Sequence, residues 1–462
     1  MAERLLQGRL GFFVLALLCA CAASVAAVYG PQWSADAAAT AGIAGVALFA
    51  IGIASPVAGL LAWLCVLPLF DAATIGPVGV ALTAGHAALA GTLAGWAIRG
   101  LRRGVALPPG AAPLMTALGA LPLAGLISAA GSPDPAATVA ASVRLVLMWA
   151  IAMMVADVAS APHRARAIHA VLVGTGCVMT GVAVVQLLFP QAEIGRAAVQ
   201  GLSAFREIVR PAAFFRDPNF LGGWLSACAV SAGVLATHAR RLGEAAPWLA
   251  CAVVCVGGVL VTASRSALVG LALGALFVVA TAPRQRRTAL ATALVVVVLA
   301  ALPVVPQSVY GRVAQLLQPQ RATSLSTRYL MAISDVRMFI EHAPAGVGLG
   351  QHDAVYPEYR LPGALPRITH PHQVPLSFIA ETGVPGLLAL VASLGAAIAL
   401  WRRAAQGGRD PLAAAAAGAA LVLVVESLFQ YYLFFEYLWI YLGLFAAAAS
   451  YRKRASDGTE TA

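Results

Sequence analysis

Long runs of apolar residues without a charged side chain constrain this chain more than any other feature. Residues 12–28, 289–305 and 384–400 are three such runs, and as helices they are long enough to cross a hydrocarbon core of roughly 30 Å. Charged residues make up 11% of the chain and hydrophobic residues 60%, whereas an ordinary soluble domain is roughly a quarter charged. The composition therefore excludes a water-soluble fold and predicts an all-α polytopic membrane protein.

The apolar pattern recurs often enough to predict 12 to 14 transmembrane helices. The candidate spans are residues 10–29, 38–54, 57–71, 78–98, 113–130, 145–160, 167–189, 219–237, 246–262, 266–282, 288–305, 374–400, 411–428 and 432–450. The segments around Pro56 are short, so the lower count treats one or two of them as re-entrant or surface-lying. We divide the chain into a helical bundle at residues 1–305 with a smaller loop at 189–218, a large loop at 306–372, and C-terminal helices with a tail at 373–462.

Basic residues mark alternate gaps between the predicted spans. The clusters are Arg4 and Arg9; Arg99, Arg102 and Arg103; Arg164 and Arg166; Arg240 and Arg241; Arg284, Arg286 and Arg287; Arg402, Arg403 and Arg409; and Arg452, Lys453 and Arg454. The positive-inside rule places these gaps, and both termini, in the cytoplasm. The formal net charge of +11 then reflects topology and contact with anionic membrane lipids, and no nucleic-acid partner is expected.

The two long loops on the other side hold more arginines than this rule predicts, and Arg144 and Arg265 are placed at outer helix ends. Both loops contain too many aromatic and apolar residues for disorder. Residues 325–342 carry apolar side chains every three or four positions, which predicts an amphipathic helix at the outer leaflet. Residues 202–209 are expected to behave in the same way in the smaller loop.

The sequence lacks the common motifs of metal and nucleotide chemistry. It contains no Asp-x-Asp pair, no phosphate-binding Gly-x-x-x-x-Gly-Lys loop, no His-Glu-x-x-His and no Gly-x-Ser-x-Gly. We therefore expect neither a metal ion nor a cofactor. The glycines at 346, 348 and 350 resemble a dinucleotide fingerprint only superficially, and a tight turn is the better interpretation.

The outer arginines and histidines suggest a different chemistry. Guanidinium groups at membrane level usually point into a protein-lined cavity, where they bind an anion, and their fork suits phosphate oxygens. For Arg210 and Arg265 the alternative is snorkelling or pairing with Glu426 or Glu436. His372 ends the large loop, and a neutral imidazole there is suited to accept a proton from a sugar hydroxyl. A base beside a diphosphate-binding arginine set fits glycosyl transfer from a lipid diphosphate.

At these residues the chain resembles the O-antigen ligase and polymerase superfamily, and most closely the ligases that complete lipopolysaccharide. The resemblance covers residues 209–388, and its motifs occur in the family's order. They are Arg210 nine residues before the Asn of Pro218-Asn219; Ser264-Arg265; Arg328 before a Pro344 to Gly350 turn; and His372-Gln373 before Glu381-Thr382-Gly383. Gln373 replaces a commoner asparagine and Arg216 a frequent glycine, which leaves sugar selectivity open.

The resemblance implies a GT-C-like fold and a metal-independent, inverting ligase with a periplasmic active site in the bacterial inner membrane. Its donor would be an undecaprenyl-diphosphate-linked glycan and its acceptor the lipid A core. By the same resemblance, His372 would activate the acceptor hydroxyl, and Arg210 and Arg265 would bind the diphosphate. Further substrate-binding candidates are Arg216, Arg328, Asn219 and His370, the last as a rival base.

Two alternatives remain open at this stage. A polymerase of glycan repeat units, or a protein O-oligosaccharyltransferase, would share the superfamily's motifs and differ only in its acceptor. A transporter of an anionic lipid or solute would also use arginines in a cavity. Transporters, however, usually show corresponding halves with broken helices near the bilayer midplane, and this sequence shows no such duplication.

Overall fold

A computed structural model describes residues 35–72, 84–105, 107–108, 110–189, 202–203, 206–207, 210–288, 290–291, 324–364, 373–406 and 410–451. Helices form almost all of this part of the chain, and six helical segments are long and apolar enough to cross a membrane. Five further apolar helices are shorter. These helices confirm an all-α polytopic membrane protein, while the total of 12 to 14 spans includes segments outside the described residues and stays a prediction.

Most helices outside the predicted loop at 306–372 begin and end close to the predicted spans. In the first half they are α2 (Ala35–Ala54), α3 (Pro56–Val66), the 3-10 helix η1 (Leu67–Ala72), α4 (Ala84–Arg103), α5 (Ala112–Ser128), the 3-10 helix η2 (Ala129–Gly131), α6 (Pro135–Val158) and α7 (Pro162–Leu188). In the second half they are α8 (Pro218–His238), α9 (Leu242–Thr262), α10 (Arg265–Thr281), α13 (Ser324–His342), α14 (His352–Tyr359), α15 (Val374–Gln406), α16 (Pro411–Glu426) and α17 (Glu436–Ala448).

Helix α6 begins ten residues earlier than predicted. Asp134 caps it by accepting a hydrogen bond from the amide of Ala137, and Pro135 occupies the first helical position, which are both favoured start signals. The polar residues Thr138 and Ser142 interrupt the apolar run, so the hydropathy pattern does not show where this helix begins. Arg144 therefore lies in the third turn of α6, and the prediction that it marks a helix end was wrong.

The smaller loop also differs from its prediction. Where the structure describes the segment predicted as an amphipathic helix, it forms strands β1 (Leu202–Ser203) and β2 (Arg206–Glu207), which pair antiparallel, and no helix. A helix of about two turns is too short to be stable alone. A hairpin instead satisfies the backbone groups of the same few residues across two strands.

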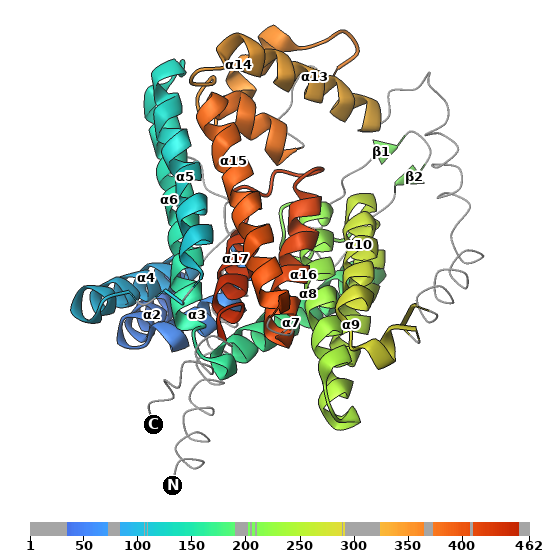
Figure 1. Ribbon diagram of the computed structural model, residues 1–462. Coiled ribbons are helices and arrows are strands. Elements are labelled where there is room, and N and C mark those ends of the chain that lie inside the picture. Colours follow the sequence, from blue (N-terminus) through green and yellow to red (C-terminus); the bar gives the residue numbers. More distant parts are fainter. Residues whose placement is uncertain are drawn as a thin grey trace.

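Helix α8 lies at the centre of the bundle. It packs against α7, α9, α10 and α16, and Figure 1 shows these helices around it. Small residues allow the close approach: a Cβ atom on Gly222 would meet Thr262 and Ala267 at 2.9 Å. Without a strong hydrophobic force between helices in lipid, such close packing is what holds transmembrane helices together.

Helices α13 and α14 lie across one end of the bundle, and the turn between α8 and α9 lies at the other (Figure 1). We call the first of these the α13 end. Helix α13 spans the predicted amphipathic segment and packs on α15. It buries Met331 and Met338, whereas Tyr329 and Ile340 are 66% and 68% exposed. The predicted apolar stripe therefore faces away from the bundle, and its contact with the outer leaflet stays a prediction.

A glycine turn joins α13 to α14 and fastens onto a kink in α15. The amides of Val347 and Gly348 donate to the carbonyls of Ala380 and Glu381, and the amide of Val384 donates back to Ala343. Gly346, Gly348 and Gly350 all have positive φ, a conformation that favours glycine. The interpretation of residues 346–350 as a tight turn is confirmed.

The kink in α15 depends on Gly383. Its backbone (φ 65°, ψ −152°) is not helical, and a Cβ atom there would lie 2.5 Å from the carbonyl oxygen of Ala343. This region of backbone space is essentially restricted to glycine, and strain of this kind costs of the order of 1–3 kcal/mol.

Gly383→Ala should therefore lower the unfolding midpoint of the purified protein, measured by differential scanning fluorimetry in one detergent. Gly395→Ala is the matched control, because Gly395 lies in the same helix and a Cβ atom there meets nothing within 4 Å. Equal midpoints for the two variants would show that the turn and the kink do not constrain each other.

Candidate functional site

Arg210 joins three segments that are distant in the sequence. Its Nε donates to the carbonyl of Thr262 at 3.1 Å, and its Nη2 donates to Oδ1 of Asn219 at 2.9 Å. The hydroxyl of Ser264 donates to the same Asn219 oxygen at 2.9 Å. The loop before α8, the start of α8 and the turn between α9 and α10 thus meet at Asn219.

The local sequence explains why these segments take their positions. Asp217 caps α8 and Ser264 caps α10, each through its side-chain oxygen. Ala263 adopts the left-handed conformation that ends α9. The amide side chain of Gln186 on α7 bonds to both the N–H and the C=O of Ala213, which fixes the loop that carries Arg210 and Arg216.

Arg265 and Arg328 complete what we call the arginine cluster, formed by Arg210, Asn219, Ser264, Arg265 and Arg328. Arg265 is exposed at the first position of α10, and Arg328 is half-buried with its guanidinium 5.8 Å from the ring centre of Phe429. Burial lowers the pKa of Arg328, and the charge of Arg265 lowers it further. The carboxylates of Glu426 and Asp217 act in the opposite direction.

This arrangement is electrostatically suited to an anion. The N-termini of α8 and α10 both lie in the arginine cluster, and helix N-termini carry partial positive charge and orphan N–H groups. Three cationic side chains, those of Arg210, Arg265 and Arg328, add to this field. The predicted site residues Arg210, Asn219, Arg265 and Arg328 are therefore brought together.

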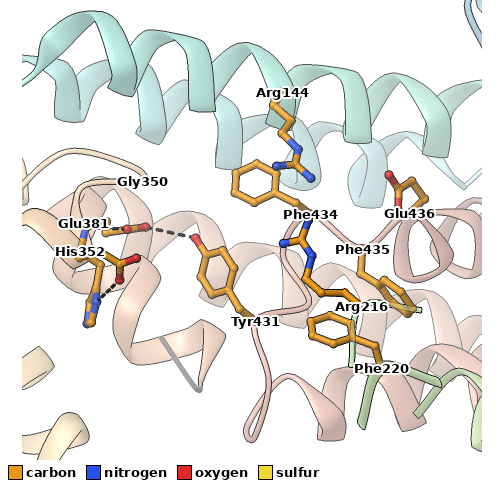
Figure 2. Close-up of a pocket in the computed structure, with 11 residues that line it drawn as sticks. Arg144, Arg216, Phe220, Gly350, His352, Glu381, Tyr431, Phe434, Phe435 and Glu436 are labelled. Atoms are coloured by element: carbon orange, nitrogen blue, oxygen red, sulfur yellow. Dashed lines mark hydrogen bonds and ion pairs between the residues drawn. The ribbon is translucent and has the colours of Figure 1, made fainter. Parts of the chain in front are cut away.

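Arg216 lies nearby, in a cavity of about 260 Å³ next to the arginine cluster. Figure 2 shows its guanidinium and that of Arg144 on either side of Phe434. The cavity continues past Tyr431 to the buried carboxyl group of Glu381. Its other lining residues are Phe220, Gly350, His352, Asp353, Phe435 and Glu436.

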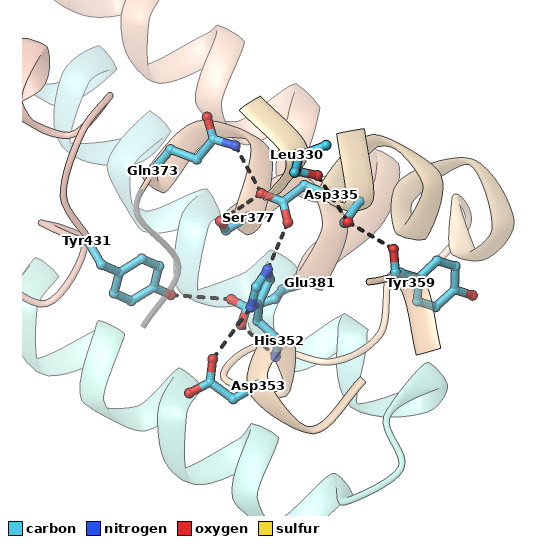
Figure 3. A network of polar contacts seen from close by, with 10 residues as sticks. Leu330, Asp335, His352, Asp353, Tyr359, Gln373, Ser377, Glu381 and Tyr431 are labelled. Carbon is cyan, nitrogen blue, oxygen red and sulfur yellow. Dashed lines mark hydrogen bonds and ion pairs between the residues drawn. The ribbon is translucent and has the colours of Figure 1, made fainter. Parts of the chain in front are cut away.

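A buried polar network ties α13, α14 and α15 together (Figure 3). Asp335 is fully buried, and its carboxylate accepts hydrogen bonds from Nε2 of His352 at 2.8 Å, the amide of Gln373 at 3.1 Å and the hydroxyl of Ser377 at 3.1 Å. Glu381 accepts from the backbone N–H of His352 at 3.1 Å and from the hydroxyl of Tyr431 at 3.3 Å. We call these residues the Asp335 network.

His370 and His372 lie outside the described residues, so the structure says nothing of their position. Gln373, directly after His372, is bonded to Asp335. Among the ranges that the structure describes, no three His, Cys, Asp or Glu side chains come together as a metal site.

Comparison with known families agrees with the motifs that lie after residue 250. Residues 250–391 match the family model described as O-antigen ligase, and no curated protein matches the chain. The matched segment contains Arg265, Arg328, the glycine turn and the kink of α15. The match confirms the resemblance to the O-antigen ligase superfamily, a class of glycosyltransferase-like membrane ligases and polymerases.

Sequence reasoning missed the Asp335 network. His352 and Asp335 carried no recognised motif, and Tyr431 lies in the loop between α16 and α17. One signal was available. Asp335 follows the apolar Met331 and Ile333 within an amphipathic helix, and a buried carboxylate in such a helix needs partners.

The network also predicts a pH dependence of stability. Burial by itself lowers the pKa of His352, but its hydrogen bond to the carboxylate of Asp335, the nearby carboxylate of Asp353 and the charges of Asp335 and Glu381 outweigh it and raise the pKa to about 9. Because this folded-state pKa lies above the usual 6.5, the stabilisation is fully present below pH 6.5. It is lost as the pH rises towards 9, and amounts to at most about 3 kcal/mol.

We therefore expect the unfolding midpoint of the purified protein to exceed that of His352→Gln at pH 6, and the gap to shrink by pH 9.5. His238→Gln serves as the control, because His238 is the last residue of α8 and lies far from the Asp335 network. A gap that stays constant between the two pH values would contradict a charged His352.

Proposed function

We propose that this protein is an O-antigen ligase of the bacterial inner membrane. It transfers a glycan from undecaprenyl diphosphate to the core oligosaccharide of lipid A, without a metal ion and with inversion at the anomeric carbon. We place the reaction at the α13 end, which we assign to the periplasm because the basic turn at Arg240 and Arg241 lies at the opposite end (Figure 1). The observation that supports this proposal best is the arginine cluster at the start of α8 and α10.

In this proposal the arginine cluster binds the diphosphate of the donor. Arg210 is already held by Thr262 and Asn219, so little side-chain entropy is lost when the donor binds. Arg265 is exposed and can reach the phosphate oxygens. Arg328 brings a third positive charge to the same place. Guanidinium groups suit the diphosphate because they form bidentate hydrogen bonds with phosphate oxygens.

The transfer itself needs a base and a stabilised leaving group. The acceptor hydroxyl oxygen attacks the anomeric carbon, its proton passes to the imidazole of His372, and the bond between that carbon and the diphosphate oxygen breaks. Negative charge gathers on the leaving diphosphate, where fixed cations stabilise it more in the transition state than in the ground state. A single displacement of this kind inverts the configuration. The assignment of His372 rests on the family resemblance, and the bond between Gln373 and Asp335 supports it by fixing the neighbouring residue.

Reconstitution tests the proposed function directly. Proteoliposomes with the purified protein, an undecaprenyl-diphosphate-linked glycan and rough lipopolysaccharide should produce glycan-capped lipopolysaccharide, seen as a shift on gels. The rate should not change with a chelator, and His372→Ala should abolish the product while leaving the protein in the membrane. Polymerised donor without any capped lipopolysaccharide would instead identify a polymerase.

Arg265→Lys should fail nearly as badly as Arg265→Ala. Lysine keeps the charge but lacks the planar fork, and loss of a charge-assisted bidentate contact lowers the rate roughly tenfold to a hundredfold. Arg284→Lys is the matched control, because Arg284 is exposed just beyond the other end of α10. Full activity of Arg265→Lys in the same assay would mean that generic positive charge is sufficient there.

A further inference from the structure

The cavity beside the arginine cluster has two chemically different ends. Arg144 and Arg216 lie at one end and Glu381 at the other, with the phenol of Tyr431 between them (Figure 2). The cavity volume of about 260 Å³ is close to the lower limit for small-molecule sites, roughly 300 Å³. It is therefore the size of a small ligand or of one sugar unit with a substituent.

The arginine end is built to bind an anion. Arg144 reaches the cavity from the third turn of α6, and its guanidinium lies 4.7 Å from the ring centre of Phe434. Arg216 comes from the loop before α8 and points towards the same ring (Figure 2). Glu436 also lines this end, so two guanidinium groups face one carboxylate. The local charge stays positive, and an anionic group would balance it.

The walls and the far end suit a sugar. Phe220, Phe434 and Phe435 contribute aromatic surfaces, on which the C–H faces of a pyranose ring can pack. The carboxylate of Glu381 is held by the N–H of His352 and the hydroxyl of Tyr431, so its position is fixed. A fixed carboxyl group on a cavity wall can accept a hydrogen bond from a sugar hydroxyl through a remaining lone pair.

The cavity adjoins the arginine cluster without being part of it. Phe220, on its wall, directly follows Asn219 and stacks on Tyr432 with ring centres 4.9 Å apart. The hydroxyl of Tyr432 in turn donates to the carbonyl of Asn219 at 3.1 Å. A ligand in the cavity would thus lie next to a diphosphate bound at Arg265. The opposite wall comes from the start of α14, at the end of the bundle that α13 and α14 cover.

We propose that this cavity binds the acceptor saccharide through a negatively charged substituent, a phosphate or a carboxylate, held by Arg144 and Arg216. This inference rests on the proposed function and divides its arginines into two sets. Arg210, Arg265 and Arg328 serve the donor, whereas Arg216, which the sequence grouped with them, serves the acceptor together with Arg144. Acceptor choice is then set by charge as well as by sugar identity.

Steady-state transfer by the full-length protein in proteoliposomes tests this division. Rough lipopolysaccharide is supplied untreated, after removal of its phosphates, or after reduction of its carboxylates. The treatment that removes the recognised group should raise the KM for the acceptor about tenfold to a hundredfold. Arg216→Gln and Arg144→Gln should raise the KM for the untreated acceptor as much, with no further effect on the treated one, and leave the KM for the donor unchanged.

Arg337→Gln is the matched control, because Arg337 is exposed on α13 and the charge change is the same. A rise in the KM for the donor would assign the cavity to the donor instead and overturn the proposal. An equal loss with treated and untreated acceptors would show that Arg144 and Arg216 only support the fold, and would also overturn it.

Equilibrium binding separates this proposal from the proposed function. Core oligosaccharide released from rough lipopolysaccharide is titrated into the purified protein without donor. Binding that weakens at least tenfold in Arg216→Gln, and after removal of one of the two anionic groups, supports the cavity even if the protein transfers no glycan. If neither Arg216→Gln nor removal of an anionic group changes the affinity, the proposal is overturned, even if the protein proves to be an active ligase.

Discussion

The pairing between the glycine turn and the kink of α15 fixes the relative position of α13, α14 and α15, and with it the Asp335 network. Four residues, Ala343, Val347, Gly348 and Val384, exchange backbone hydrogen bonds across this contact or with Ala380 and Glu381. Buried backbone groups that lose such partners are costly, above all at membrane depth. The contact therefore holds His352 next to Glu381 and Asp335. It also positions Gly350 and Asp353, which line the cavity.

The site combines two kinds of order. The arginine cluster is organised by helix ends, where capping residues and orphan carbonyls determine which groups lie together. The Asp335 network is organised by burial, because a carboxylate that is removed from water needs several donors. The first arrangement leaves cations exposed to a ligand, and the second makes the surrounding helices rigid. Preorganised charge next to a rigid support is what stabilisation of a charged leaving group requires.

Most helices could be predicted from apolar runs that end at proline, aspartate or serine. Arg210, Asn219 and Ser264 of the arginine cluster could be picked out from the sequence through the resemblance to the O-antigen ligase superfamily, and the family match covers Ser264 but neither Arg210 nor Asn219. The start of α6 could not be predicted, because polar residues interrupt the apolar pattern there. The pairing of β1 with β2 could not be predicted either, because each strand has only two residues. The Asp335 network could not either. Its bonded partners are 17 to 50 residues apart, and only tertiary packing, chiefly that of α13 on α15, brings them together.

One carboxylate of α13 has a mechanical consequence. Asp335 bonds to Gln373 at the start of α15 and to His352 at the start of α14, while the opposite face of α13 exposes Tyr329, Val336 and Ile340. A tilt or a shift in depth of α13 would therefore pull directly on the residue beside His372. In the proposed function, where α13 rests on the outer leaflet and His372 accepts the proton of the acceptor hydroxyl, the thickness of the surrounding lipid would then affect the position of this base.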